Sequence, residues 1–490
     1  MKKGQSSRRT KKTKEVRRER AFELESEFCG KLLVIQNWGG NYMFRKRIFV
    51  LLIGMLLLLG AAFPFFADVR DTMKVPAGFE FGTYKTKPWA GTTLNVAMVA
   101  EPRSDAIAKI VPEFEKLTGI KVNVNILAYP TLQEKQMVAL TQGSGSYDVV
   151  HVDCVWVGQY AGEGWTIPVE EYILRTDHNT LALDDFIPAV VSEQGMWQDR
   201  IFGLPFIQAV FGLYYRTDIF EKYNVKVPQT WDELRDTAKL LNQKEPGVYG
   251  ITFMGRRGVQ LQCTYDNMLW SFGGSWFDSK FNPTINSKAA VDALDYFKSL
   301  IPFAPPGVLT YDWDENANAY AQGTAAMTIQ WQNAAPTFEN PAKSKIVGKF
   351  AFTFVPGQPQ SDGSMSRTPT FGGWSFQIPK DSKNKEAAWE FIVWVTSQKV
   401  DPVLALAQPG SRFSGLLDPK EQAKHVEYKG MLESLPIAKG RPRLGAYSEL
   451  ADALEVALSD AMTGAKASKQ ALDDANTKFA FILKKWKYLK

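Results

Sequence analysis

The sequence predicts an α/β protein with two lobes. Of its 490 residues, 45% are hydrophobic and 22% are charged, which is ordinary for a soluble globular protein with room for two or three domains. From Thr92 onward, strand-like apolar runs alternate with amphipathic helical segments, and a second cycle of similar build begins after Phe206. This alternation is typical of parallel, doubly wound sheets, and its repetition indicates two lobes.

The first cycle contains three expected strands and two expected helices. The strands are "TLNVAMVA" at 93–100, "KVNVNILA" at 121–128 and "DVVHVD" at 148–153. The helix at 104–119 has an apolar face and a terminating glycine, and a shorter helix covers 131–143. Each strand is short and apolar, so we expect the sheet to be buried.

The second cycle begins with a strand, "VFGLYYR", and continues with helices whose ends are marked in the sequence. Thr230 and Glu233 have the spacing of a capping box at the start of a helix, and Trp231 between them is assigned to packing. A long C-terminal helical region is expected from Ser448 to Tyr488. The remaining expected elements are a helix at 287–301, a strand at 323–331, a strand at 372–379 and a helix at 384–397.

The net charge of +6 comes from the N-terminal end. Residues 1–47 hold 14 Lys and Arg against 5 Asp and Glu, so the rest of the chain is slightly acidic. A slightly acidic folded part excludes an electrostatic footprint for nucleic acid. Residues 1–42 are interpreted as a basic tail, either solvated or the product of a start codon assigned too early, and they are left out of the fold argument.

Residues 43–67 have the order of an export signal. Three charges, Arg45 to Arg47, precede an uncharged run from Ile48 to Ala67. The segment is predicted to be a signal peptide or an N-terminal membrane anchor, because 20 apolar residues are also long enough to cross a bilayer. No cysteine directly follows, which argues against a lipoprotein anchor. The protein is therefore expected in the periplasm or outside the cell, with an uncleaved N-terminal helix as one way of holding it there.

Acidic, amide and aromatic residues follow the expected strands of both cycles. In open α/β sheets, ligands bind beyond the carboxyl ends of the strands. We therefore expect a ligand site formed by Glu101, Asp153, Trp156, Gln208, Trp331 and Trp374. For each residue a structural role is the alternative: a tryptophan can pack at the rim, and Asp153 can cap the next helix.

This mixture of side chains suits a sugar or polyol. Aromatic faces pack on the C–H face of a sugar, and carboxylate, amide and guanidinium groups bind neighbouring hydroxyls. The chain has three histidines without metal-ligand spacing, and it lacks the glycine-rich motifs of nucleotide sites and the serine motif of hydrolases. No metal or cofactor is expected. Arg256 and Arg257 are interpreted as solvated loop residues, one of which could reach the ligand.

Several stretches together resemble the bacterial extracellular solute-binding proteins of sugar ABC transporters. The resemblance covers about 400 residues in order and spacing, and its main stretches are 148–172, 201–241, 323–331, 372–397 and 457–475. It implies a two-lobe, periplasmic-binding-protein-like (type II) α/β fold with a hinge and an interlobe ligand cleft. The implied lobes are 91–205 plus 373–405 and 206–372 plus 406–490.

The resemblance also implies ligand contacts. In trehalose- and maltose-binding members, the contacts correspond by position to Glu101, Asp153, Trp331, Trp374 and Arg412. Those members have an acid after the crossing strand, where this chain has Gln208. "PPGVLTYDWDEN" at 305–316 is closer to polyol-binding members, which adds Asp314, Glu315 and Asn316 as candidates.

The sequence therefore predicts an exported receptor that binds a sugar or polyol between two lobes and delivers it to an ABC importer. The expected partners are the ligand and the permease subunits in the membrane; nucleic acid is not expected, and the protein is expected to be a monomer. Two alternatives stay open. One is a glycoside hydrolase that uses paired carboxylates on a bound sugar, and the other is a sugar receptor that only senses.

Overall fold

The computed structural model describes residues 87–405 and 407–489. The chain divides into two compact units, Met1–Thr72 and Met73–Lys490, and all described residues belong to the second. The predictions for the tail at 1–42 and the segment at 43–67 lie outside the described residues. Within the described part, no helix is both long and apolar enough to cross a membrane.

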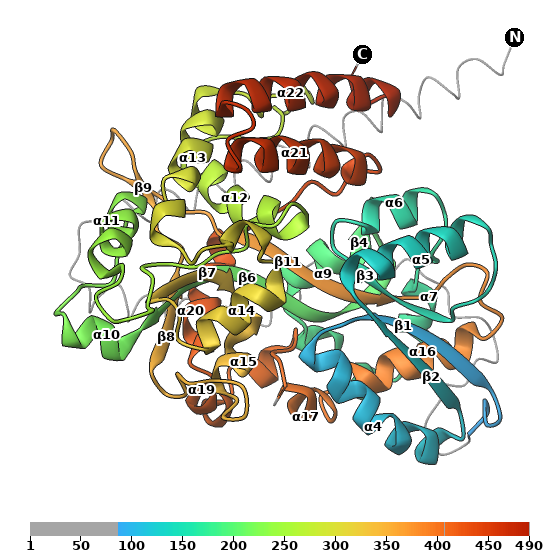
Figure 1. Cartoon of the computed structure of the whole chain (residues 1–490). Coiled ribbons are helices and arrows are strands. Elements are labelled where there is room, and N and C mark those ends of the chain that lie inside the picture. The colour runs from blue at the N-terminus through green and yellow to red at the C-terminus, as the bar shows by residue number, and fades with distance from the viewer. Residues whose placement is uncertain (1–86, 406, 490) are drawn as a thin grey trace, which may run out of the picture. The chain divides into compact units, whose positions relative to one another are not determined.

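The first lobe is built on three parallel strands. The three strands predicted in the first cycle are present, and β1 (Thr93–Val99) lies between β2 (Lys121–Leu127) and β3 (Val149–Asp153). The connecting helices are α4 (Pro102–Thr118) and α5 (Tyr129–Thr141). These elements form the blue and teal half of the molecule, together with α16 (Lys385–Val395), in Figure 1.

Two long neighbouring strands connect the halves. β6 (Gly203–Arg216) and β11 (Thr370–Gln377) pair with each other in antiparallel orientation, and β11 also pairs with β3. The sheet order is β2-β1-β3-β11-β6-β7, with β8 on β6 and β12 (Lys439–Gly440) on β11. The predicted lobe boundaries at 205/206 and 372/373 fall inside these two strands.

The second lobe corrects the expectation of a purely parallel sheet. β7 (Met327–Trp331) and β8 (Phe350–Phe354) are both antiparallel to β6, and the described parallel pairings there are the short one of β12 with β11 and isolated bridges such as Tyr249 with Ala325. The physical reason is that β6 enters this lobe from the first lobe, so the next strands return beside it. Alternating apolar runs set the element types but not the strand directions.

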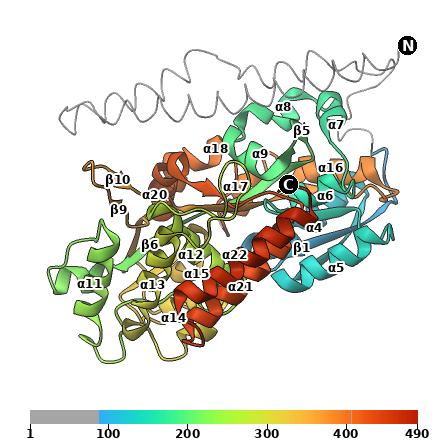
Figure 2. The same ribbon diagram turned by 90° about the horizontal axis from the view of Figure 1, so that it is seen from above.

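The helices of the second lobe cover this sheet in Figures 1 and 2. The capping box at the start of α11 is present, with both reciprocal bonds between Thr230 and Glu233. Trp231 is fully buried, as its assignment to packing predicts. Ahead of the two C-terminal helices, the described helices of eight or more residues here are α11 (Trp231–Leu241), α12 (Val259–Ser271), α13 (Lys288–Lys298), α14 (Trp313–Ala321) and α20 (Glu427–Ser434).

The C-terminal helical region is interrupted. α21 (Tyr447–Met462) and α22 (Ser468–Lys485) are separate helices, and Gly464 in the turn between them has φ 79°. The two helices lie side by side in both ribbon views (Figures 1 and 2). The expected helical region from Ser448 to Tyr488 is therefore present as two helices, and glycine at the turn allows the left-handed backbone that reverses the chain.

Candidate functional site

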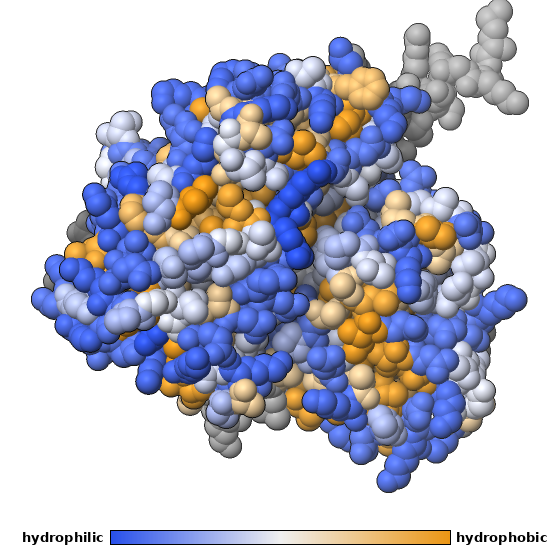
Figure 3. All heavy atoms as spheres, in the orientation of Figure 1, coloured by the Kyte–Doolittle hydropathy of each residue, from blue (hydrophilic) through white to orange (hydrophobic). Residues whose placement is uncertain are grey.

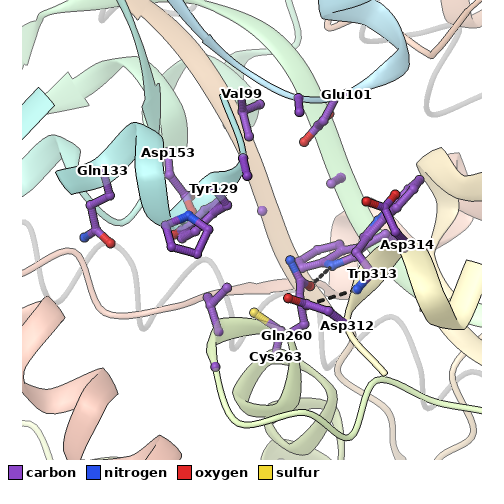
Figure 4. Close-up of a pocket in the computed structure, with 18 of the residues that line it drawn as sticks. Val99, Glu101, Tyr129, Gln133, Asp153, Gln260, Cys263, Asp312, Trp313 and Asp314 are labelled. Atoms are coloured by element: carbon purple, nitrogen blue, oxygen red, sulfur yellow. Dashed lines mark hydrogen bonds between the residues drawn. The ribbon is translucent and has the colours of Figure 1, made fainter. Parts of the chain in front are cut away.

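A cavity of about 460 Å³ lies between the two halves, at the carboxyl ends of β1 and β3. One side is formed by residues such as Glu101, Tyr129 and Asp153, and the other by residues 256–260 and 312–315 at the starts of α12 and α14. Figure 4 shows Asp153 beside Tyr129, with Gln260, Asp312 and Asp314 across the space from them. In the space-filling view, hydrophilic side chains lie around the hollow between the two halves (Figure 3).

Glu101 is held at the cavity wall by two neutral donors. It occupies the N-cap position of α4, but its side chain makes no capping bond. Instead it accepts hydrogen bonds from Trp374 Nε1 at 3.1 Å and Gln408 Nε2 at 2.8 Å. Burial raises the pKa of Glu101 to about 7, and nearby Asp153 acts in the same direction. The group is therefore poised between its neutral and charged forms near neutral pH.

Asp153 is fixed more firmly than Glu101. It lies directly opposite Trp374 in the β3–β11 register, which explains how residues more than 200 positions apart come together. Its carboxylate accepts a bond from Tyr129 Oη at 2.8 Å and is paired with Arg441 Nη2 at 3.1 Å. Asp153 and Arg441 are both buried, so the charges compensate each other in a low-dielectric setting.

Trp331 and Trp374 supply aromatic surface to the cavity. Trp331 Nε1 donates to Gln260 Oε1 at 2.7 Å, which fixes the indole at the end of β7. Gly372 makes room for this ring, because a Cβ at that position would lie 2.9 Å from it. Gly373 has φ 141°, and a Cβ there would lie 2.3 Å from the Ile207 carbonyl oxygen. The "GG" before Trp374 is thus required by close backbone approach.

The opposite wall is charged and more exposed. Asp312 caps α14 and forms a capping box with Glu315. Arg256 is paired with Asp312 and lies 3.6 Å from Glu315. Arg257, the next residue, lines the cavity and is paired at 3.0 Å with Asp452. Both arginines of the "GRRG" segment therefore line the cavity while staying about half exposed, where the sequence predicted solvated loop residues, one of which could reach the ligand.

Six of the candidate residues from the sequence line this cavity. They are Glu101, Asp153, Asp314, Glu315, Trp331 and Trp374. Asn316 does not line it: its amide bonds Thr252 and Thr328 in the interior. Four of these six residues were predicted from strand ends, and Asp314 and Glu315 were predicted from the resemblance to polyol-binding members.

Trp156, Gln208 and Arg412 do not line the cavity either. Trp156 packs behind Trp374 with its ring centroid 5.5 Å away, so it supports the wall from the protein interior. Gln208 is buried and donates to the Gly410 carbonyl at 3.1 Å. Arg412 is buried elsewhere, where it donates to the carbonyls of Thr396, Ala182 and Leu181. Its guanidinium holds loops of the first lobe together.

Other cavity residues were not singled out from the sequence. Arg441 and Tyr129 bind Asp153, while Asn333 and Glu455 lie on the wall. Arg441 follows β12, a two-residue strand too short to produce a period-2 signal. Tyr129 could have been found, because it directly follows the second expected strand and so obeys the same strand-end rule.

The cavity can bind a polar ligand through hydroxyl donors and acceptors and can stack it on indole rings. In the part of the chain that the structure describes, no group of three or more His, Cys, Asp or Glu side chains could hold a metal ion. Both described cysteines, Cys154 and Cys263, are buried and free. Burial raises the pKa of both thiols, so neither has the character of an activated nucleophile.

Comparisons with known proteins agree with this geometry. Residues 100–402 match the family model of the bacterial extracellular solute-binding proteins. A crystal structure of an ABC transporter solute-binding protein from Agrobacterium radiobacter K84 in complex with ribitol is 31% identical. The similarity covers 80% of this chain and 98% of that chain, with a TM-score of 0.75.

Two curated proteins are similar over most of their length. The mannitol-binding protein of Pseudomonas aeruginosa is 25% identical over 423 residues, which cover 81% of this chain and 94% of that protein. A Sinorhizobium fredii protein named "Probable amino-acid ABC transporter periplasmic-binding protein" is 25% identical over 419 residues, which cover 82% of this chain and 92% of that protein.

Proposed function

The chain belongs to the family of bacterial extracellular solute-binding proteins, and from this membership we propose that it is the receptor of an ABC importer for a polyol or a small sugar. The observation that carries the proposal is the cavity between the halves, with hydrogen-bonding groups and indole rings from both sides. Its volume of about 460 Å³ lies in the range of small-molecule sites. A ligand there would contact both lobes at once and so stabilise a closed arrangement.

We propose Glu101, Asp153, Asp314, Glu315, Trp331 and Trp374 as ligand contacts, because all six line the cavity. Arg441 takes the place that the sequence gave to Arg412, since it lies in the cavity wall beside Asp153. Trp156 and Gln208 are proposed to support the wall from behind. The hinge is proposed at β6 and β11, where the chain passes between the lobes.

A polyol or small sugar is favoured over a disaccharide. The position after the crossing, where disaccharide-binding members have an acid, is Gln208, and its side chain is committed to Gly410. The similarity to the solute-binding protein in complex with ribitol and to the mannitol-binding protein covers nearly the whole length of each of them.

A free amino acid is the second candidate, suggested by the name of the Sinorhizobium relative. Its carboxylate would need a free cation in the cavity. The three arginines that line the cavity, Arg256, Arg257 and Arg441, are all paired with carboxylates in the described structure. A neutral polyhydroxy ligand needs no such cation, so the geometry favours it.

The delivery step follows from the family. Its members serve ABC importers, and we propose that permease subunits in the membrane bind the ligand-closed form. The location is proposed as the periplasm or the cell exterior, reached through the segment at 43–67.

Thermal unfolding of the purified protein with ribitol, mannitol, maltose and a set of amino acids tests the proposal. A ligand at 100 times its Kd adds about 2.7 kcal/mol to the free energy of unfolding. We expect a clear rise in Tm with a polyol or a monosaccharide and a loss of that rise in Glu101→Ala. The control is Trp89→Ala, at an exposed residue outside this cavity. A rise with an amino acid alone would contradict the proposal.

A further inference from the structure

Three carboxyl groups in the cavity wall have no ion-pair partner among the described residues. They are Glu101 at the N-cap of α4, Asp314 in α14 and Glu455 in α21. Glu101 is bound only by neutral donors. The arginines of the wall are committed elsewhere: Arg441 to Asp153, and Arg256 to Asp312. The cavity thus has more carboxylates than cations.

Asn333 adds a further acceptor without a donor. It lies in the short turn that follows β7, its side chain lines the cavity, and it is only 4% exposed. Its Oδ1 has no hydrogen-bond partner. A buried carbonyl oxygen that lacks a donor costs free energy, so this atom indicates a donor on the ligand.

Among the buried side-chain atoms of the described wall, one acceptor and one donor lack a hydrogen-bond partner, so the excess of acceptors comes from the three unpaired carboxyl groups. Arg441 Nε is buried without a partner and is the wall's one nitrogen of this kind in the described part of the chain. A hydroxyl group brings one donor and two acceptor positions, whereas a protonated amine brings three donors and a positive charge. The unmet groups of the wall are therefore matched better by a ligand with an ammonium group than by hydroxyls alone.

The indole rings that line the cavity also favour a ligand with a positive charge. Trp331 and Trp374 border the same space, and Trp313 does so from the second lobe. Indole faces attract cations as well as the C–H faces of sugars. A polyhydroxylated ammonium ligand would use both properties.

We infer that the ligand is a polyhydroxylated amine, such as an amino alditol or an amino sugar, whose ammonium group binds at the wall that carries the unpaired carboxyl groups and Asn333. This inference rests on the proposed function, because it names the ligand class of the same site. The hydroxyl groups contact the tryptophans, Arg441 and Asp153, as they would in a neutral polyol.

The ionisation of the carboxyl groups supports this inference. Burial raises the pKa of Glu101 and of Glu455 to about 7, and it also raises the pKa of Asp314. An ammonium group beside one of these carboxyl groups would supply a positive charge and favour the charged form of that carboxyl.

Titration calorimetry of the purified full chain with D-glucitol and with 1-amino-1-deoxy-D-glucitol at pH 7.5 tests the inference. The two ligands differ only in one hydroxyl that is replaced by an amine. We expect the amine to bind about tenfold more tightly, and we expect Glu455→Gln to reduce that ratio to about threefold or less. The matched control is Glu449→Gln on the same helix, because Glu449 is paired with Lys485 outside the cavity and its loss should leave the ratio unchanged.

The outcomes separate this inference from the proposed function. Equal or tighter binding of D-glucitol would overturn the inference and leave the proposed function standing. Binding of another neutral sugar when neither glucitol compound binds would do the same. If no sugar, polyol or amine raises Tm, both the inference and the proposed function are wrong.

Discussion

The two walls of the cavity differ in how firmly their charges are held. On the first wall, formed by Glu101, Tyr129, Asp153 and Trp374, the ion pair to Arg441 is buried, with side-chain exposures of 5% for Asp153 and 3% for Arg441. On the second wall, formed by 256–260 and 312–315, Arg256 and Asp312 are exposed by 48% and 30%. The first wall is set before a ligand arrives, whereas the second can rearrange around it.

This difference follows from the elements that carry each wall. Asp153 and Trp374 are direct partners in the sheet, so the backbone hydrogen bonds of β3 and β11 fix them. Arg256 comes from a loop, and Asp312 from the first position of α14. We therefore expect the first wall to stay rigid, and ligand-dependent closure to change mostly the second wall.

The largest expected effect is that of Arg441→Met on the first wall. Removing the cation leaves Asp153 as an uncompensated buried charge, so we expect the free energy of unfolding to fall by about 3–5 kcal/mol. Urea denaturation measures it. The double variant Arg441→Met, Asp153→Asn should recover part of the loss because no charge stays buried. A loss below about 1 kcal/mol in the single variant would mean that the two walls do not differ.

A smaller effect is expected for Glu101→Gln, and it should depend on pH. The folded-state pKa of about 7 lies above the ordinary value of 4.5, so the stabilisation from the bound proton is complete below pH 4.5. It is lost as pH rises through 7. Between pH 5 and 8 the wild type should therefore lose about 2 kcal/mol more than the variant, after allowance for partial exposure. Parallel stability curves for the two proteins would contradict this assignment.

The smallest expected effect is that of Arg256→Met on the second wall. Its ion pairs with Asp312 and Glu315 are partly exposed, so we expect a loss of about 0.2–1 kcal/mol. Raising the salt concentration should diminish even this loss, because exposed charges are screened. Thermal unfolding at low and high salt measures both. A loss as large as that of Arg441→Met would erase the contrast between the walls.

Much of the fold could be predicted from the sequence, because local signals agreed with the tertiary structure. Thr230 and Glu233 form the expected capping box, and Ala388, Phe391, Ile392 and Val395 are buried on the expected face of α16. Strand direction could not be predicted. A strand that crosses between lobes has the same apolar pattern as one that stays in its lobe, so β6 gave no sign that β7 and β8 would be antiparallel to it.

The site could be predicted where its residues directly follow strands. Glu101, Asp153 and Trp331 come from this rule, and all three line the cavity. Arg441 was missed because its place is set by a two-residue strand paired with β11. Trp156 comes only three residues after Asp153, yet it points into the interior. A turn separates the two residues, and the sequence does not indicate to which side each side chain of that turn points.

The paired strands β6 and β11 also determine how the halves can move. Two antiparallel, hydrogen-bonded strands form a ribbon that twists easily about its length but resists sliding, and a register shift between Trp374 and Ser375 marks its irregular point. The expected motion is therefore a rotation of one lobe relative to the other about the axis of these two strands. Trp374 lies on these two strands, so we expect its position to change little during this motion. Asp314 and Glu455 lie on helices away from the strands, so we expect them to move farther.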